Sequence, residues 1–198
     1  MKRICYLFSL LILLSCQKST LDSTGKLDES QEFDEMSIYQ LPSQWTTQKG
    51  DQIEFKDLEG QTLVVVMIYT ACRTACPRLV ADLRGIEGAV KNQTKDPVKY
   101  ILVSIDPKND TPDRLLTFAK ENGMDGDQWI FLQGTDESTR DFANILAVKY
   151  KEISPMDFSH SNIISVFDKK GILQYQKEGL GLENQDIVSQ IIQTVAEG

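Results

Sequence analysis

Two cysteines, Cys72 and Cys76, lie between a long apolar run and a helical pattern. The apolar run, residues 63–69, is rich in valine and predicts a strand that is buried on both faces. Pro77 follows the second cysteine, and proline suits the first turn of a helix. The two thiols are therefore expected where a central strand turns into a helix. Backbone N–H groups at a helix N-terminus favour the thiolate, which is both a nucleophile and a soft metal ligand.

The third residue that could do chemistry is His160, the single histidine, in the segment D-F-S-H-S-N. Two thiolates and one imidazole suit copper, because sulfur favours Cu(I) and imidazole binds both oxidation states. Structural zinc prefers four ligands, and Asp106 or Asp110 could supply the fourth, so the residues leave zinc open. A simpler interpretation of these two aspartates is a loop and a helix cap, and it is preferred for Asp110. The simplest alternative for the two cysteines is a stable Cys72–Cys76 disulfide.

The composition is that of an ordinary globular protein, with 41% hydrophobic and 25% charged residues among 198. The formal net charge is −8, and the basic residues lie among acidic ones, which argues against nucleic acid as a partner. Cys5 and Cys16 belong to the N-terminal segment, so the rest of the chain has one local cysteine pair and no disulfide framework. One domain without internal repeats is expected, and a monomer is the default.

The N-terminus has the pattern of a targeting segment. Residues 1–15 combine a basic start with an apolar stretch that is too short to span a bilayer, as in a signal peptide. The end of this stretch, L-L-S-C, resembles a bacterial lipoprotein signal, which implies that Cys16 is lipidated and begins the mature protein. An ordinary signal peptide with an incidental Cys16 is the alternative. Residues 16–35 are polar and predict a flexible tether, so the domain is expected outside the cytoplasm and anchored to a membrane.

Residues 36–198 predict one α/β domain in which strands and helices alternate. The segments S-I-Y-Q-L and Q-I-E-F predict two short strands or a hairpin before the central strand. Further strands are expected at residues 98–104 and 129–132, and a strand hairpin at residues 163–175. Residues 150–160, with Pro155, predict a loop.

Helices are expected after Pro77, Thr111, Thr135 and Asn184. The predicted buried face of the third helix carries Phe142, Ile145 and Leu146. This order of elements is typical of a thioredoxin-like fold: a central mixed sheet flanked by helices, with an N-terminal strand or hairpin extension. In such a fold the segment before the strand at residue 163 faces the cysteine loop, so His160 is expected near both sulfurs.

Four segments resemble the motifs of the Sco/SenC family of copper-binding proteins, and they occur in the family's order over roughly residues 36–198. They are Y-T-A-C-R-T-A-C-P, V-S-I-D-P-K-N-D-T-P, W-I-F-L-Q-G, and F-S-H-S with F-D-K-K-G. The resemblance implies a thioredoxin-like fold in which Cys72, Cys76 and His160 bind copper. It also implies a role in assembling the binuclear copper centre of cytochrome c oxidase subunit II, in a membrane-anchored protein that faces away from the cytoplasm.

One position departs from the family motif: Arg73 stands where the family has a proline. Arginine beside Cys72 favours its thiolate, but a fixed cation disfavours copper close by. A copper metallochaperone need not be an enzyme. The alternative is a thiol–disulfide oxidoreductase, in which Cys72 attacks, Cys76 resolves, and the acceptor's cysteines are kept reduced. A peroxidase-like activity that uses Thr70 and Arg73, and a purely regulatory role, are further alternatives.

Overall fold

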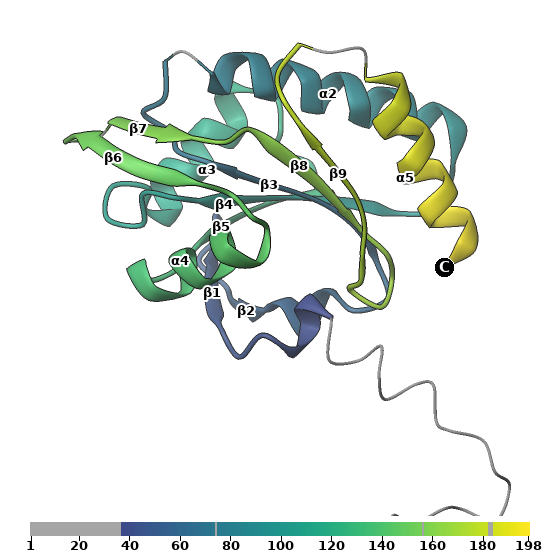
Figure 1. The fold of residues 1–198 in the computed structure, drawn as a ribbon, viewed down its shortest axis with the longest axis horizontal. Helices are drawn as coiled ribbons and strands as arrows, with labels where there is room; N and C mark the ends of the chain where they lie inside the picture. The colour runs from purple at the N-terminus through teal and green to yellow at the C-terminus, as the bar shows by residue number, and fades with distance from the viewer. Residues whose placement is uncertain (1–36, 74, 156, 182–183) are drawn as a thin grey trace, which may run out of the picture.

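The computed structural model describes residues 37–198 except 74, 156 and 182–183 (Figure 1). The predicted signal peptide, the lipidation of Cys16 and the tether lie outside the described residues. The strands of the main sheet are β1 (Gln44–Thr47), β2 (Gln52–Glu54), β3 (Thr62–Ile68), β4 (Val98–Ser104), β5 (Trp129–Gln133), β8 (Ile163–Phe167) and β9 (Leu173–Glu178). A separate two-stranded sheet consists of β6 (Tyr150–Ser154) and β7 (Asp157–His160). The helices are α2 (Cys76–Gln93), α3 (Pro112–Glu121), α4 (Asp136–Ile145) and α5 (Gln185–Glu197), with the 3-10 helices η1 (Ile38–Gln40) and η2 (Phe55–Leu58).

The main sheet is mixed, as predicted, with the strand order β2-β1-β5-β4-β3-β8-β9. Strands β3, β4 and β5 are parallel neighbours, which is the arrangement that α-helical crossovers produce. Strand β1 pairs antiparallel with β5 and β2, and β8 pairs antiparallel with β3 and β9. The predicted α/β fold with a central mixed sheet is therefore confirmed.

Strand β3 is the centre of the core, and all 7 of its residues are buried. Helices α2 and α5 lie side by side over one face of the sheet, while α4 lies on the opposite side (Figure 1). The predicted apolar stripe of α2 is buried; it consists of Leu79, Val80, Leu83, Ile86 and Val90. Because helices cover both faces, a strand at this position buries the side chains of both faces, which explains the uninterrupted apolar run at residues 63–69.

An aromatic cluster closes the other face of the sheet. Phe142 of α4 stacks on Phe55 with ring centroids 4.6 Å apart, and it meets the edge of Trp45 at 5.5 Å. Leu146 is also buried, as predicted. The prediction for Ile145 was wrong, because its side chain is 45% exposed. It is the last residue of α4.

The segment S-I-Y-Q-L is not a strand. Residues 38–40 form the 3-10 helix η1, in which the Ser37 hydroxyl accepts a hydrogen bond from the backbone N–H of Tyr39. The Tyr39 hydroxyl in turn donates to the backbone carbonyls of Leu58 (3.1 Å) and Gln61 (3.2 Å). These long-range contacts override the local strand pattern. The predicted hairpin exists, but the partner of β2 is β1.

Residues 150–160 also differ from the prediction, because they form the β6–β7 hairpin instead of a loop. The hairpin projects from the body of the domain, and its strands pair with each other and not with the main sheet (Figure 1). Every residue of β6 after Tyr150 is exposed, so the sequence lacks the apolar alternation that marks a half-buried strand. Pro155 lies in the turn.

The aromatic cluster leads to a stability prediction. Phe142→Ala is expected to lower the free energy of unfolding by about 3–5 kcal/mol, because it removes a fully buried ring and leaves a cavity against Trp45 and Phe55. Ile145→Ala, three residues further along the same helix, is expected to change it by less than about 0.5 kcal/mol. Urea denaturation of both variants checks this, and equal losses for the two would contradict the assignment of α4's buried face.

Candidate metal centre

The dithiol lies where the strand-to-helix pattern placed it. After β3 ends, the backbone N–H of Cys72 donates to the carbonyl of Tyr69 (3.3 Å) and closes a tight turn. Helix α2 begins at Cys76, with Pro77 in its first turn. The thiols therefore stand at the carboxyl end of the central strand. In parallel sheets this edge is where ligands commonly bind, because the helix N-termini point toward it.

The antiparallel pairing of β8 with β3 brings the histidine to the same edge. Val66 pairs with Ile164, so the residues that precede β8 lie beside the carboxyl end of β3. His160 is the last residue of β7 and pairs with Tyr150 of β6. The backbone N–H of Ser161 donates to the carbonyl of Lys149 (2.8 Å) and holds the base of the hairpin.

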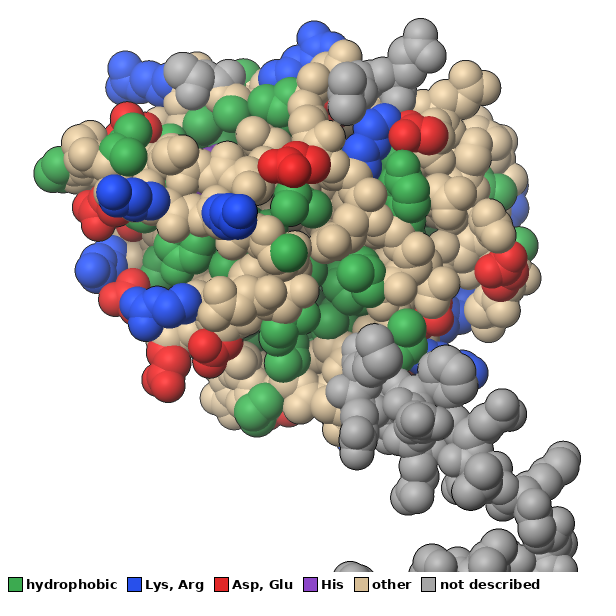
Figure 2. Space-filling view, viewed as in Figure 1, with side chains coloured by type: hydrophobic (Ala, Val, Ile, Leu, Met, Phe, Trp, Pro, Cys, Tyr) green, Lys and Arg blue, Asp and Glu red, His purple; other side chains and the backbone are tan. Residues whose placement is uncertain are grey.

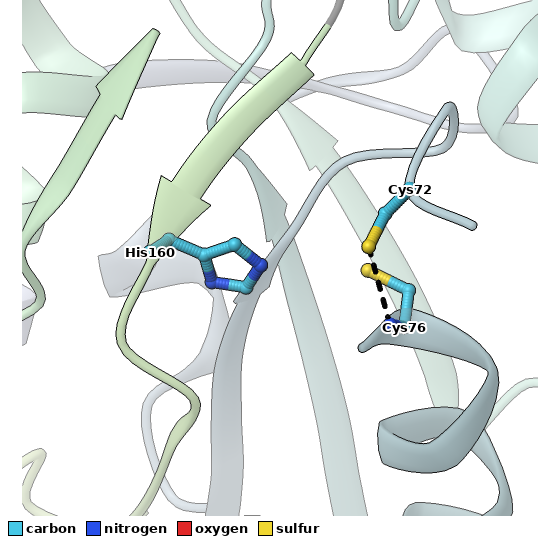
Figure 3. A group of neighbouring side chains, drawn as sticks. All are labelled: Cys72, Cys76 and His160. Atoms are coloured by element: carbon cyan, nitrogen blue, oxygen red, sulfur yellow. Dashed lines mark hydrogen bonds between the residues drawn. The ribbon is translucent and has the colours of Figure 1, made fainter. Parts of the chain in front are cut away.

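The expected proximity of the three side chains is present. One ligand atom from each of Cys72, Cys76 and His160 lies within 4.8 Å of the other two (Figure 3). The sulfurs point toward each other, and the imidazole of His160, at the end of β7, faces them (Figure 3). Both cysteines are buried, and neither is part of a disulfide among the described residues. Metal bonds to nitrogen and sulfur of about 2.0–2.3 Å place two ligands of one ion at most about 4.6 Å apart, so only small shifts are needed to enclose an ion.

The imidazole has one nitrogen free for a ligand. His160 Nδ1 lies 3.0 Å from the carbonyl oxygen of Ser161, which can only accept, so Nδ1 carries the proton. Nε2 then presents its lone pair, and it is buried without a hydrogen-bond partner among the described residues. Burial lowers the pKa of His160 and favours the neutral form. An imidazole whose other nitrogen is bonded to a carbonyl is the usual arrangement of a metal-ligating histidine.

The two thiols differ in their surroundings. The backbone N–H of Cys76, at the start of α2, donates to Cys72 Sγ (3.3 Å; dashed in Figure 3). The Cys76 thiol donates to the carbonyl of Tyr69 (3.5 Å). Burial raises the pKa of Cys76, so the expectation that the helix N-terminus lowers the pKa does not hold for this thiol. A soft metal ion must therefore displace a proton from Cys76, whereas the helix N-terminus directs an N–H group at Cys72.

The aspartates proposed as a fourth ligand are not in this cluster. The Asp106 carboxylate accepts two hydrogen bonds from the Asn109 amide (2.8 and 3.0 Å). Asp110 is buried and accepts from the Ser104 hydroxyl (2.6 Å) and from the backbone N–H of Thr70 (3.1 Å). Asp110 thus has a structural role in this segment, and the predicted cap of the helix, Thr111, caps α3 by accepting from the backbone N–H of Arg114.

Asp110 therefore holds the loop that leads to the dithiol. One feature of the sequence pointed to this role. Asp110 stands directly before Thr111, which already caps the helix, so the Asp110 carboxylate is available for another contact. Arg73, which departs from the family motif, is exposed on the dithiol loop. Thr70, at the start of the same loop, is held in place: its hydroxyl donates a hydrogen bond to Asp110 and accepts one from Arg114 Nε (2.7 Å).

The single histidine permits a direct test of the site's electrostatics. The lowered pKa means that the folded protein binds the proton on His160 less tightly than the unfolded chain does. The contribution of the neutral imidazole to the free energy of unfolding is therefore fully present above the ordinary pKa of 6.5. It is lost as the pH falls through the pKa that His160 has in the folded protein. We expect the single imidazole NMR signal to titrate below pH 6.5 in the folded protein and near it in urea.

His160→Gln serves as the control for this measurement. In that variant the free energy of unfolding is expected to lose the part of its pH dependence that lies just below pH 6.5. A titration midpoint at or above 6.5 in the folded protein would be incompatible with a buried, neutral imidazole.

Comparisons with known proteins agree with this geometry. A family model described as SCO1/SenC matches residues 31–197. The SCO1 protein homolog of Bacillus subtilis (strain 168) is 32% identical over 97 residues, which are 49% of this chain and 50% of that protein. The chain therefore spans about half the length of this curated relative.

Solved structures share the fold. A SCO1/SenC family lipoprotein from Bacillus anthracis str. Ames is 24% identical, with a TM-score of 0.70 over 76% of this chain and 91% of that one. Bradyrhizobium japonicum ScoI with copper bound is 21% identical, with a TM-score of 0.65 over 78% and 98% of the two chains. Since the family model matches most of the described residues and the fold is shared, this chain belongs to the SCO1/SenC family.

Proposed function

We propose that this protein is a copper carrier that binds one copper ion through Cys72, Cys76 and His160. The observation that carries the proposal is His160: one imidazole nitrogen lies within 4.8 Å of both cysteine sulfurs, and its buried Nε2 has no hydrogen-bond partner among the described residues. A buried polar atom without a partner is costly, and a metal ion supplies the partner. Two sulfurs and one imidazole favour copper over harder cations. The copper-bound Bradyrhizobium japonicum structure, which shares the fold, supports this choice of metal.

The proposed task is delivery of copper to the binuclear centre of cytochrome c oxidase subunit II, as the family resemblance implies. A three-ligand site suits delivery, because an acceptor can replace the ligands one at a time. His160 reaches the site on a projecting hairpin, whereas both cysteines belong to the core (Figure 1). We infer that the imidazole is the first ligand to leave and that the thiolates hold the ion until the acceptor's ligands replace them.

The charge distribution fits a protein partner and not a nucleic acid. On the face drawn in Figure 2, Lys and Arg side chains stand among Asp and Glu side chains and form no continuous basic surface. The formal net charge of −8 opposes attraction to phosphate.

A copper titration of the reduced protein tests the proposal. The wild type is expected to retain one copper ion per chain after desalting, measured by metal analysis. Cys76→Ser and His160→Ala are each expected to lose it, because the two remaining donors bind the ion too weakly to retain it through desalting. Ser159→Ala, an exposed position on the same strand as His160, serves as the control and should bind like the wild type.

Retention of copper in Cys76→Ser would exclude this ligand set. An absence of copper binding in the wild type would instead favour the second candidate, a thiol–disulfide oxidoreductase. Two observations favour this candidate independently. Cys72, at 7% exposure, is more accessible than Cys76 at 1%, and its sulfur accepts a hydrogen bond from the N–H of Cys76 at the helix N-terminus.

In that reaction the Cys72 thiolate attacks a partner disulfide, forms a mixed disulfide and releases one partner thiolate. The Cys76 thiol then passes its proton to the released partner thiolate, and its sulfur attacks Cys72 Sγ and releases the second partner thiolate, so the partner gains two electrons and a Cys72–Cys76 disulfide forms. The partner disulfide in this reaction is the one formed by the acceptor's copper-binding cysteines. The two candidates separate at His160→Ala, which weakens copper binding so far that the ion is lost on desalting but leaves disulfide reduction intact.

We also propose that the domain is anchored to a membrane on the extracytoplasmic side through a lipidated Cys16. The lipoprotein from Bacillus anthracis, a family member with the same fold, supports this arrangement. No helix among the described residues is long and apolar enough to cross a membrane. Lipid chains contribute about 0.8 kcal/mol per buried methylene group, so they can hold the domain at the surface.

Cys16→Ser tests the anchor. This variant is expected to lose incorporation of labelled fatty acid and to move from the membrane fraction to the soluble extracytoplasmic fraction. Cys5→Ser is the matched control and should remain in the membrane fraction with its label. A labelled, membrane-bound Cys16→Ser protein would refute the anchor.

A further inference from the structure

Tyr69 contacts both halves of the proposed copper site. It follows the last residue of β3, and its backbone carbonyl accepts hydrogen bonds from the N–H of Cys72 (3.3 Å) and the thiol of Cys76 (3.5 Å). One carbonyl group therefore sets the positions of both cysteines relative to the end of the central strand.

The side chain of Tyr69 reaches in the other direction, to the hairpin that carries the histidine. Its hydroxyl lies 3.0 Å from the Asp157 carboxylate and 3.2 Å from the carbonyl of Phe158, to which it can donate. The same hydroxyl accepts from the backbone N–H of Phe158 (3.4 Å). The ring meets Phe158 and His160 edge-on, at centroid distances of 5.3 and 5.7 Å.

A tyrosine hydroxyl has an ordinary pKa of about 10 and carries its proton at neutral pH. A protonated hydroxyl can donate to Asp157 while its lone pairs accept from the backbone of Phe158.

The end of β3 on which Tyr69 stands is firmly held. The next residue, Thr70, donates its backbone N–H and its hydroxyl to the buried Asp110 carboxylate. Asp110 is 1% exposed and also accepts from Ser104 of β4. The β6–β7 hairpin, by contrast, pairs only with itself among the described strands and projects from the body. Tyr69 thus connects a rigid support to a projecting arm.

We propose that Tyr69 is a positioning residue, whose hydroxyl fixes the β6–β7 arm so that the His160 imidazole faces the dithiol. It acts through His160 and does not itself bind the ion. This inference rests on the proposed function for its effect on copper, but the positioning of the arm is a property of the metal-free protein. The loss of hydrogen bonds that orient a metal ligand typically weakens binding by about 10- to 100-fold.

Tyr69→Phe isolates the hydroxyl, because it keeps the ring contacts and the backbone carbonyl. We expect its copper affinity, measured by competition with a chelator, to fall at least about tenfold relative to the wild type. Tyr39→Phe is the matched control. It also removes a hydroxyl that donates to two backbone carbonyls, but this hydroxyl lies at the opposite end of β3, next to its first residue. It should bind copper like the wild type, although both variants lose some thermal stability.

A double-mutant cycle distinguishes positioning from a general structural effect. In the His160→Ala background, Tyr69→Phe should weaken the residual copper binding by less than about twofold, because the ligand it positions is gone. An equal loss in both backgrounds would overturn the inference.

Hydrogen exchange of the metal-free protein supplies a readout that does not depend on copper. The Phe158 amide, which donates to the Tyr69 hydroxyl, should exchange about tenfold faster in Tyr69→Phe and at the wild-type rate in Tyr39→Phe. Unchanged exchange at this amide in Tyr69→Phe would refute the positioning role even if the wild type binds copper. Failure of the wild type to bind copper would refute the proposed function but leave this test decisive for the arm.

Discussion

The arrangement of the site depends on how β3 pairs with its two neighbours. Parallel pairing with β4 and antiparallel pairing with β8 put the end of β3 and the start of β8 at one edge of the sheet. The dithiol follows the first of these ends and the histidine precedes the second. The dithiol and His160, which are more than 80 positions apart in the chain, meet because β3 pairs with β8 in a fixed register: β3 is buried on both faces and cannot shift without exposing apolar side chains.

Burial has opposite consequences for the two kinds of ligand. It lowers the pKa of His160, so the imidazole is neutral and its Nε2 lone pair is available. It raises the pKa of Cys76, so that thiol keeps its proton until something replaces it. A soft cation is the natural replacement, since it pairs with the thiolate without leaving a bare charge in the core. The same buried surroundings therefore disfavour a metal-free thiolate and favour a metal-bound one.

The site combines a rigid part and a projecting part. Cys72 and Cys76 are attached to the core through the Tyr69 carbonyl and the start of α2, whereas His160 stands on a hairpin with its own small sheet. A carrier must hold its cargo and also release it, and a ligand on an arm can leave without disturbing the fold. Tyr69 is the residue through which the arm and the core are linked.

Sequence patterns were sufficient wherever local spacing reflects burial. The buried run of β3, the helix after Pro77 and the amphipathic stripes of α2 and α5 all follow from apolar periodicity, because the core accepts only apolar side chains at those positions. The thiols at a strand-to-helix junction follow from the same patterns.

Tertiary contacts decided the rest. The segment S-I-Y-Q-L became a 3-10 helix because the Tyr39 hydroxyl binds distant carbonyls, and residues 150–160 became strands because they pair with each other away from the core. Asp110 holds the dithiol loop through hydrogen bonds from Thr70 and Ser104, and the residues next to Asp110 in the sequence do not predict these contacts. The residue types alone determined which side chains could bind a soft metal. Only the folded structure brought their ligand atoms within 4.8 Å of one another and left Nε2 of His160 without a hydrogen-bond partner among the described residues, because distance and burial depend on strand pairing and not on local sequence.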